Sequence, residues 1–153
     1  MISEGDMAPD FTLPRDGGGT ITLSELRPGK AVVYFYPKDD TPGCTKEAIG
    51  FTEHLDAFKA AGCDIIGISK DTAAKHDKFL AKHALGVILA SDADDQVCEA
   101  YGVWKEKSMY GKTYMGIERS TFLIGGDGKV LNAWHKVRVP GHVEAVLEAA
   151  QSA

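Results

Sequence analysis

The sequence predicts an α/β fold of three layers (α/β/α), in which helices cover both faces of a mixed central β-sheet. Three observations carry this prediction. Short apolar runs typical of buried strands alternate with helical patterns in the first two thirds of the chain. A strong hairpin signal and one more helical pattern follow near the C-terminus. The 153 residues, 44% of them hydrophobic, are enough for the core of one domain, which we expect to span residues 1–153.

The first predicted element is an N-terminal β-hairpin. Residues 11–13 and 20–23 have the composition of short strands, and the glycines of residues 16–19 supply the positive φ angles that a tight turn needs. These glycines are followed neither by Gly-Lys-Ser/Thr nor by a helical pattern, so they do not form a phosphate-binding loop.

A strand–helix–strand unit comes next. Residues 31–36 are a continuous run rich in β-branched and aromatic side chains, which predicts a strand buried on both faces. After a loop over residues 37–43, apolar residues at helical spacing predict one helix that ends at Gly62. Residues 65–68 form the second buried strand. The side chains that define the helix are Ala48, Ile49, Phe51, Leu55 and Phe58.

The same pattern then repeats once. Asp71 and Thr72 offer an N-cap for a helix that reaches His83, and residues 87–89 predict a third, short strand. Because the strands of such units pair in parallel, we expect these three strands to form the parallel part of the sheet.

The last third of the chain predicts a helix, a hairpin and a closing helix. Asp92 or Asp94 can begin the first helix, which contains Val97 and Tyr101. Two strands, over residues 121–124 and 129–134, flank a Gly-Gly-Asp-Gly turn and should pair antiparallel. The resulting mixed sheet is the thioredoxin-like arrangement. The apolar face of the closing helix consists of Val143, Val146, Leu147 and Ala150.

Composition and charge exclude several classes of protein. The 17 basic and 22 acidic residues give a net charge of -5, so the basic footprint of a nucleic-acid binder is absent and casual self-association is opposed. No apolar run approaches the length of a membrane span, and the N-terminus has no secretory signal pattern. Three cysteines are too few for a disulfide framework and fit a reducing compartment. We therefore expect a cytoplasmic protein that binds neither nucleic acid nor membrane.

Cys44 is the strongest candidate functional residue. It follows the carboxyl end of the first buried strand, in the first turn of the next helix, where α/β sheets bind ligands. A helix N-terminus favours an anion, and the thiolate of a cysteine is such an anion. Thr41 can place a hydroxyl beside the sulfur, while Pro42 and Gly43 fix the turn. The alternative is a small, unreactive buried residue, but nothing at this junction requires sulfur for packing.

The residues around Cys44 resemble the active-site signature of the peroxiredoxins, Pro-x-x-x-Thr-x-x-Cys, and in particular that of the bacterioferritin comigratory protein (PrxQ) subfamily. The resemblance extends over nearly the whole chain, in several blocks that occur in the same order. It implies a thiol-dependent peroxidase that reduces hydrogen peroxide and alkyl hydroperoxides. Together with the net charge of -5, it also implies a monomer or weak homodimer. The matching blocks are Gly5-Asp6-x-Ala8-Pro9-Asp10-Phe11-Thr12-Leu13, Tyr36-Pro37-Lys38, Thr41-Pro42-Gly43-Cys44-Thr45, Ser91-Asp92, Tyr101-Gly102-Val103-Trp104 and Arg119-Ser120-Thr121-Phe122-Leu123-Ile124.

The resemblance also implies roles for Cys44 and Arg119, and Glu47 lies close to Cys44 in the predicted helix. Cys44 is the peroxidatic cysteine, which attacks the O–O bond and becomes a sulfenic acid. Arg119 matches the family's active-site arginine, whose fixed charge holds the thiolate and stabilises the leaving oxygen. Glu47, one helical turn after Cys44, can orient Arg119, or it is a first-turn acid favoured by the helix dipole.

Three further residues are implied to act on the peroxide. Thr41 hydrogen-bonds the thiolate and the peroxide, and the backbone N–H of Gly43 or Cys44 holds the other oxygen. Pro37 shields the pocket from water. The chemistry takes place on sulfur, so no metal, flavin, haem or other cofactor is expected.

The chain departs from the subfamily in its second cysteine. Many members carry a resolving cysteine at one of two positions, which are Ile49 and Leu80 here. Cys63 is expected to be a small buried hydrophobe, and Cys98 stays a minority candidate because helices of this fold can unfold locally. We therefore expect one-cysteine recycling, in which thioredoxin, glutaredoxin or glutathione attacks the sulfenic acid of Cys44.

Other kinds of site fit these residues less well. A dithiol oxidoreductase needs Cys-x-x-Cys, but Thr41 and Glu47 stand at the two positions three residues from Cys44. The histidines do not cluster with cysteine at zinc-ligand spacing, and we expect His76 and His83 to lie on a solvated helix face. Spacing alone does not exclude a Cys/His/Asp hydrolase. A redox sensor without turnover is the non-enzymatic alternative.

Overall fold

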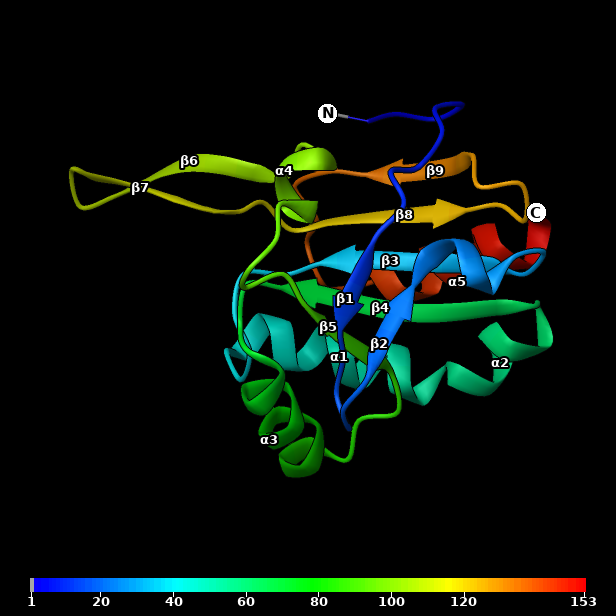
Figure 1. The fold of residues 1–153 in the computed structure, drawn as a ribbon, viewed down its shortest axis with the longest axis horizontal. Helices are drawn as coiled ribbons and strands as arrows, with labels where there is room; N and C mark the ends of the chain where they lie inside the picture. The colour runs from blue at the N-terminus through cyan, green and yellow to red at the C-terminus, as the bar shows by residue number, and fades with distance from the viewer. Residues whose placement is uncertain (1) are drawn as a thin grey trace.

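The structure is a computed structural model that describes residues 2–153. Its core is a mixed sheet whose strands are β3 (Lys30–Phe35), β4 (Cys63–Ser69), β5 (Ile88–Ser91), β8 (Ser120–Ile124) and β9 (Val130–Trp134). They lie in the order β5-β4-β3-β8-β9 (Figure 1). β4 is parallel to β3 and β5, while β8 is antiparallel to β3 and β9. The predicted mixed sheet is therefore confirmed.

Helices pack against one face of this sheet. Val32 and Tyr34 of β3 point to this face and belong to one apolar cluster with Phe51 and Phe58. The hydroxyl of Thr72 accepts a hydrogen bond from the N–H of Lys75, so the predicted cap of the third helix is confirmed. The helices that contribute to this cluster are α1 (Pro42–Glu53), α2 (Leu55–Ala60), α3 (Ala73–His83) beside β5, and α5 (His142–Ser152).

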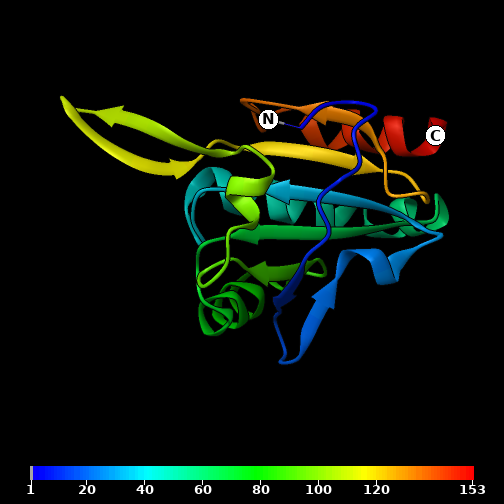
Figure 2. The ribbon, with the colours of Figure 1, turned by 45° about the horizontal axis from the view of Figure 1, so that its top comes forward.

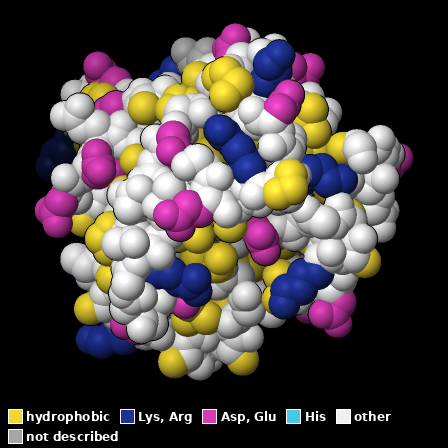
Figure 3. Space-filling view, turned by 45° about the vertical axis from the view of Figure 1, so that its right-hand side comes forward, with side chains coloured by type: hydrophobic (Ala, Val, Ile, Leu, Met, Phe, Trp, Pro, Cys, Tyr) yellow, Lys and Arg dark blue, Asp and Glu magenta, His cyan; other side chains and the backbone are white. Residues whose placement is uncertain are grey.

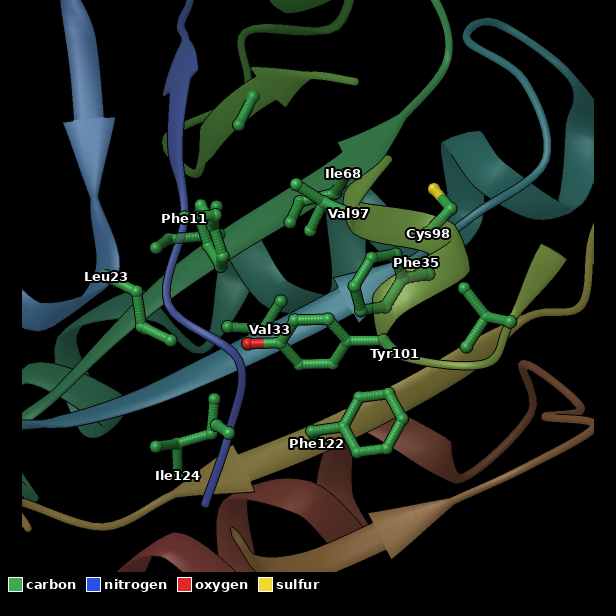
Figure 4. Close-up of a cluster of buried hydrophobic side chains, with 14 of the residues drawn as sticks. Phe11, Leu23, Val33, Phe35, Ile68, Val97, Cys98, Tyr101, Phe122 and Ile124 are labelled. Atoms are coloured by element: carbon green, nitrogen blue, oxygen red, sulfur yellow. The ribbon is translucent and has the colours of Figure 1, made fainter. Parts of the chain in front are cut away.

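The N-terminal segment and one short helix cover the opposite face. β1 (Thr12–Pro14), β2 (Thr20–Thr22), the 3-10 helix η1 (Leu23–Leu26) and α4 (Val97–Ala100) contribute to this layer. In Figure 4, Phe11, Leu23 and Tyr101 surround Val33 and Phe35 of β3. The side chains of β3 thus alternate between two apolar layers, as a strand buried on both faces requires. The predicted hairpin and three-layer arrangement are confirmed.

The prediction of one continuous helix up to Gly62 is wrong. α1 ends at Glu53, and His54 leaves the helical region with φ -101° and ψ 9°. The Nδ1 atom of the His54 ring lies 2.9 Å from the carbonyl oxygen of Gly50, which also accepts from the backbone N–H of His54. This local side-chain bond competes with the helical pattern, and α2 begins again at Leu55.

Two further boundaries differ from the prediction. α4 begins at Val97, not at Asp92 or Asp94. The carboxylate of Asp92 nevertheless accepts the N–H groups of Val97 and Cys98 at 3.1 and 2.8 Å, so it caps the helix from several residues away. The third strand is Ile88–Ser91, slightly later than residues 87–89.

A second hairpin occupies a segment for which the sequence patterns predicted no element. β6 (Trp104–Met109) and β7 (Lys112–Ile117) pair only with each other and project from the body of the molecule, as Figures 1 and 2 show. Tyr110 and Gly111 connect them with φ angles of 52° and 77°, which a type I′ turn requires. These strands are charged and largely exposed, so they lack the apolar alternation that marks a half-buried strand.

The surface carries charges of both signs. On the face drawn in Figure 3, basic and acidic side chains are interspersed with apolar ones. Among the helices of residues 2–153, none combines the length and the apolar character that crossing a membrane takes. The assignment of residues 1–153 to one domain stays a prediction.

Candidate active site

Cys44 is the third residue of α1, directly after the loop that leaves β3. Thr41 is the N-cap, with an extended backbone, and Pro42 is the first helical residue. The first backbone bond of the helix runs from the N–H of Thr45 to the carbonyl oxygen of Thr41, so the N–H groups of Gly43 and Cys44 precede it. The side chain of Cys44 is buried, with 2% of the residue exposed. Its sulfur therefore lies at the positive end of a helix and largely out of water.

Arg119 connects Cys44 to a buried acid. Its Nη2 donates to the sulfur of Cys44 at 3.3 Å, and its Nη1 donates to Oε1 of Glu47 at 2.7 Å. The residue precedes β8, and Ser120 pairs with Phe35 at the end of β3. Strand pairing thus carries the guanidinium to the start of α1. The structure thus brings together Cys44, Glu47 and Arg119, three of the residues that the sequence analysis placed at one site.

Gly43 makes room for this arrangement. A Cβ atom at position 43 would lie 3.1 Å from Nη2 of Arg119, which is closer than nearly all Cβ contacts in proteins. A side chain here would push the guanidinium away from the sulfur of Cys44. Glycine at this position is therefore explained by the close approach of Arg119.

Glu47 has an unusual environment for an acid. It is fully buried, and burial raises its pKa to about 7 even though Arg119 favours its charged form. Its second oxygen, Oε2, has no hydrogen-bond partner among the described residues and lies 4.0 Å from Nε2 of His142. Burial, followed by the charge of Arg119, lowers the pKa of His142 to about 4. Burial by itself would lower the pKa of the Arg119 guanidinium. The charges of Glu47 and Cys44 and their hydrogen bonds to Arg119 outweigh the effect of burial, so this pKa is raised.

Thr41 and Pro37 lie at the edge of the site. The hydroxyl of Thr41 donates to the carbonyl oxygen of Lys38 at 2.8 Å, and within residues 2–153 it makes no bond to the sulfur of Cys44. The expected bond between Thr41 and the thiolate is therefore not present. Because its proton is already donated, the Thr41 oxygen can act as an acceptor for a peroxide O–H. Pro37 is exposed and lines a groove that also includes Lys107.

The loop before α1 is tied to α3 by contacts that the sequence analysis missed. Nδ1 of His76 lies 2.7 Å from the carboxylate of Asp39, and Nε2 lies 3.0 Å from the carbonyl oxygen of Ala90. Asp40 contacts Lys82 and His83 at 2.7 and 2.8 Å. The prediction that His76 lies on a solvated face is wrong, because this residue is completely buried. Its partners are distant in sequence, so helical spacing carried no signal for them.

The other two cysteines are buried as well. Cys98 belongs to the apolar cluster on the face of the sheet opposite Cys44 (Figure 4), and burial strongly raises its pKa. Cys63 shares the cluster of Cys44, and burial raises its pKa to about 12. All three are free thiols. Leu80 and Ile49 pack at the margin of the same cluster as Cys44. Within residues 2–153 no group of His, Cys, Asp and Glu could hold a metal ion.

Comparisons with known proteins agree on one family. Residues 4–133 match the AhpC/TSA family. The chain is 49% identical over 144 residues to peroxiredoxin Bcp of Xanthomonas campestris, which covers 93% of this chain and 90% of that protein. Its fold is similar to that of a cysteine-to-serine mutant of Xylella fastidiosa PrxQ, with a TM-score of 0.94, 39% identity and coverage of 99% and 97%. It is also similar to the bacterioferritin comigratory protein of Xanthomonas campestris, studied for its alkyl peroxide reduction activity, with a TM-score of 0.88, 46% identity and coverage of 93% and 90%.

Proposed function

Because the chain belongs to the AhpC/TSA family, as a thiol-dependent peroxidase of the bacterioferritin comigratory protein (PrxQ) subfamily of peroxiredoxins, we propose that Cys44 is the residue that reduces the peroxide. The observation that carries the proposal is the contact of 3.3 Å between Nη2 of Arg119 and the sulfur of Cys44, at the N-terminus of α1. A fixed cation and a helix N-terminus both favour the thiolate, which is the nucleophilic form of cysteine.

The proposed reaction is an attack of the thiolate on one oxygen of the peroxide. A lone pair of sulfur forms the S–O bond, the electron pair of the broken O–O bond leaves with the second oxygen, and that oxygen takes up a proton to give water or an alcohol. Arg119 stabilises the charge that moves onto the leaving oxygen, because its charge is in place before the reaction begins. The products are the sulfenic acid of Cys44 and one molecule of water or alcohol.

The loop before α1 binds the peroxide in this proposal. The N–H groups of Gly43 and Cys44 precede the first helical bond and can donate to a peroxide oxygen. The oxygen of Thr41 accepts the O–H of the peroxide, since its own proton is donated to Lys38. Pro37 stands outside the pocket and limits the access of water. Hydrogen peroxide and alkyl hydroperoxides are the proposed substrates, and the alkyl peroxide reduction activity of the Xanthomonas campestris protein supports the second class.

Recycling of Cys44 by an external thiol is the second part of the proposal. To form a disulfide with Cys44, Cys98 would have to leave the apolar cluster on the other face of the sheet, where it is completely buried. Cys63 is also buried, at the start of β4. An incoming thiol needs neither rearrangement, so thioredoxin, glutaredoxin or glutathione is the proposed reductant. Among the described residues, no contact favours a Cys44–Cys98 disulfide or a sensor without turnover.

Peroxide consumption with dithiothreitol as reductant tests the proposal. The Cys44→Ser variant should lose the activity, because the attacking sulfur is gone. The matched control is Cys63→Ser, which changes a buried cysteine of the same cluster and should keep wild-type turnover. Turnover that persists in Cys44→Ser would assign the chemistry to another residue.

We also propose, from the charge and the cysteine content of the sequence, that the protein acts in the cytoplasm as a monomer or weak homodimer.

A further inference from the structure

One guanidinium contacts two acidic groups at this site. Arg119 donates to the sulfur of Cys44 through Nη2 and to Oε1 of Glu47 through Nη1. Both acidic groups are buried, with 2% and 0% of these residues exposed. If both were ionised at once, two negative charges would share one positive charge in a site with little water. Uncompensated charge is costly in such surroundings, so the site is most stable when one of the two acids is neutral.

Within residues 2–153, no group besides Arg119 supplies Glu47 with a positive charge. His142, at the start of α5, faces Oε2 at 4.0 Å, but its pKa is lowered to about 4, so it is neutral at physiological pH. Tyr34 of β3 is buried and its pKa is raised, so it is also neutral. Beyond these, Lys107 lies near Arg119 and Cys44, and Glu144 lies near His142, without a salt bridge to Glu47.

The two oxygens of Glu47 are in different surroundings. Oε1 accepts from Arg119 and can do so as a carboxylate oxygen or as the carbonyl oxygen of a carboxylic acid. Oε2 is buried without a partner, which is expensive for a charged oxygen. A proton on Oε2 removes that charge and leaves the bond to Arg119 intact. Burial raises the pKa of Glu47 to about 7, so both forms are within reach at neutral pH.

We propose that Glu47 carries the proton that balances the charge of Cys44 during the catalytic cycle. Glu47 is protonated while Cys44 is a thiolate, and it gives up this proton when peroxide converts Cys44 to the sulfenic acid. The step is Cys44–S⁻ + ROOH + Glu47–COOH → Cys44–SOH + ROH + Glu47–COO⁻. The O–O bond breaks, the S–O bond forms, two electrons pass from sulfur to the leaving oxygen, and one proton is transferred in the net reaction.

The charges of Cys44, Glu47 and Arg119 therefore sum to zero both before and after the reaction. Glu47 does not touch the peroxide, so it acts as a charge-balancing and positioning residue for Cys44 and Arg119. The leaving oxygen takes up one proton and Glu47 gives up one, so the net reaction takes no proton from the solution. Two equivalents of external thiol regenerate the thiolate of Cys44: the first forms a mixed disulfide with Cys44 and releases water, and the second displaces Cys44 as the thiolate and leaves as a disulfide with the first. The proton that remains in this balance returns to Glu47. This inference rests on the proposed peroxidase reaction of Cys44 and adds the path of its proton.

Proton uptake after one equivalent of hydrogen peroxide tests the inference. A pH indicator in weak buffer reports the number of protons taken up, and mass spectrometry reports the sulfenic acid. In the wild type, uptake should be near zero at about pH 6, where Glu47 supplies the proton, and near one at about pH 8.5, where it is already ionised. Glu47→Gln cannot supply a proton and should take up one at both pH values. Ultraviolet absorbance of the thiolate in this variant verifies the ionised state of Cys44 at the lower pH. Equal uptake in wild type and Glu47→Gln would overturn the inference.

Infrared difference spectra give an independent readout in the wild type itself. Oxidation of Cys44 at about pH 6 should remove a protonated-carboxyl C=O band, because Glu47 loses its proton. The band should disappear equally in Glu53→Gln, a matched change at an exposed acid of α1, and should be missing from the difference spectrum of Glu47→Gln. If Glu47→Gln does not fold, the infrared difference spectrum and the proton uptake of the wild type test the inference without it. Uptake of one proton at the lower pH with no change in a carboxyl band would overturn the inference. A wild type in which Cys44 is not oxidised would instead overturn the proposed function and the inference together.

Discussion

Substituting methionine for Arg119 removes the cation that contacts both Cys44 and Glu47, while it keeps much of the apolar volume of the side chain. A hydrogen bond to a charged group contributes about 1.5–3 kcal/mol. At 1.4 kcal/mol for each factor of ten, the loss of the contact with the sulfur should slow peroxide reduction by roughly 10- to 100-fold. The measurement is the rate of oxidation of reduced Cys44 in a single turnover, with ultraviolet absorbance reporting its thiolate fraction.

The same substitution leaves Glu47 buried without a cation. Removing one partner of a buried ion pair costs about 3–5 kcal/mol if the other stays ionised. Glu47 avoids this cost when it is protonated, and the loss of Arg119 raises its pKa further. Arg119→Met should therefore be folded at about pH 6 and lose stability as the pH rises toward 8.

A double variant separates the effect on chemistry from the effect on stability. In Arg119→Met/Glu47→Gln, no buried carboxylate remains to be stranded, so thermal stability should fall less between about pH 6 and 8 than in Arg119→Met. The rate of peroxide reduction should stay at the low value of the single variant. If the double variant recovered the wild-type rate, Arg119 would act through folding and not on Cys44. An unchanged rate in Arg119→Met at saturating reductant would also refute the reasoning.

Three further predictions concern recycling, pH and assembly. After stoichiometric peroxide without reductant, dimedone should trap a sulfenic acid on Cys44, and Cys98→Ser should keep wild-type turnover. A Cys44–Cys98 disulfide in good yield, with activity lost in Cys98→Ser, would replace the one-cysteine mechanism and leave the peroxidase assignment standing. Burial raises the pKa of Glu47 from 4.5 to about 7, so between these pH values the folded state holds a proton that the unfolded state has lost. The proton contributes about 3 kcal/mol to the free energy of unfolding below pH 4.5, and this contribution is lost as the pH rises from 4.5 to about 7. The pKa of His142 is lowered to about 4, so His142 makes the free energy of unfolding rise with pH between about 4 and 6.5. In the wild type, Glu47 offsets this rise. In Glu47→Gln, the free energy of unfolding measured in urea should therefore rise with pH more steeply than in the wild type. Parallel pH profiles of the two proteins would contradict the assignment of these shifts. Light scattering should give the mass of a monomer or dimer, and a stable decamer would exclude it.

The sequence by itself determined the strands of the main sheet and the place of the candidate catalytic cysteine. The run over residues 31–36 is apolar on both faces, which a strand between two layers requires, and β3 matches it closely. Cys44 follows that strand at a helix start, so its position is set by residues close to it in the chain. The roles of Thr41, Pro37 and Arg119 came from the family resemblance and stay predictions, because local patterns do not report on chemistry.

The tertiary structure decided which groups meet. Arg119 lies 75 residues from Cys44 and reaches its sulfur because β8 pairs with β3, a pairing that periodicity alone does not locate. His76 of α3 is buried against Asp39, which lies in the loop before α1, and the ring of His54 contacts the carbonyl oxygen of Gly50 where the first helix breaks. Glu47 could be read from the sequence as an ordinary first-turn acid. Its burial beside a shared guanidinium, with one oxygen unpartnered, exists only once α1, α5 and β8 pack together, because desolvation is a property of the surroundings and not of the residue.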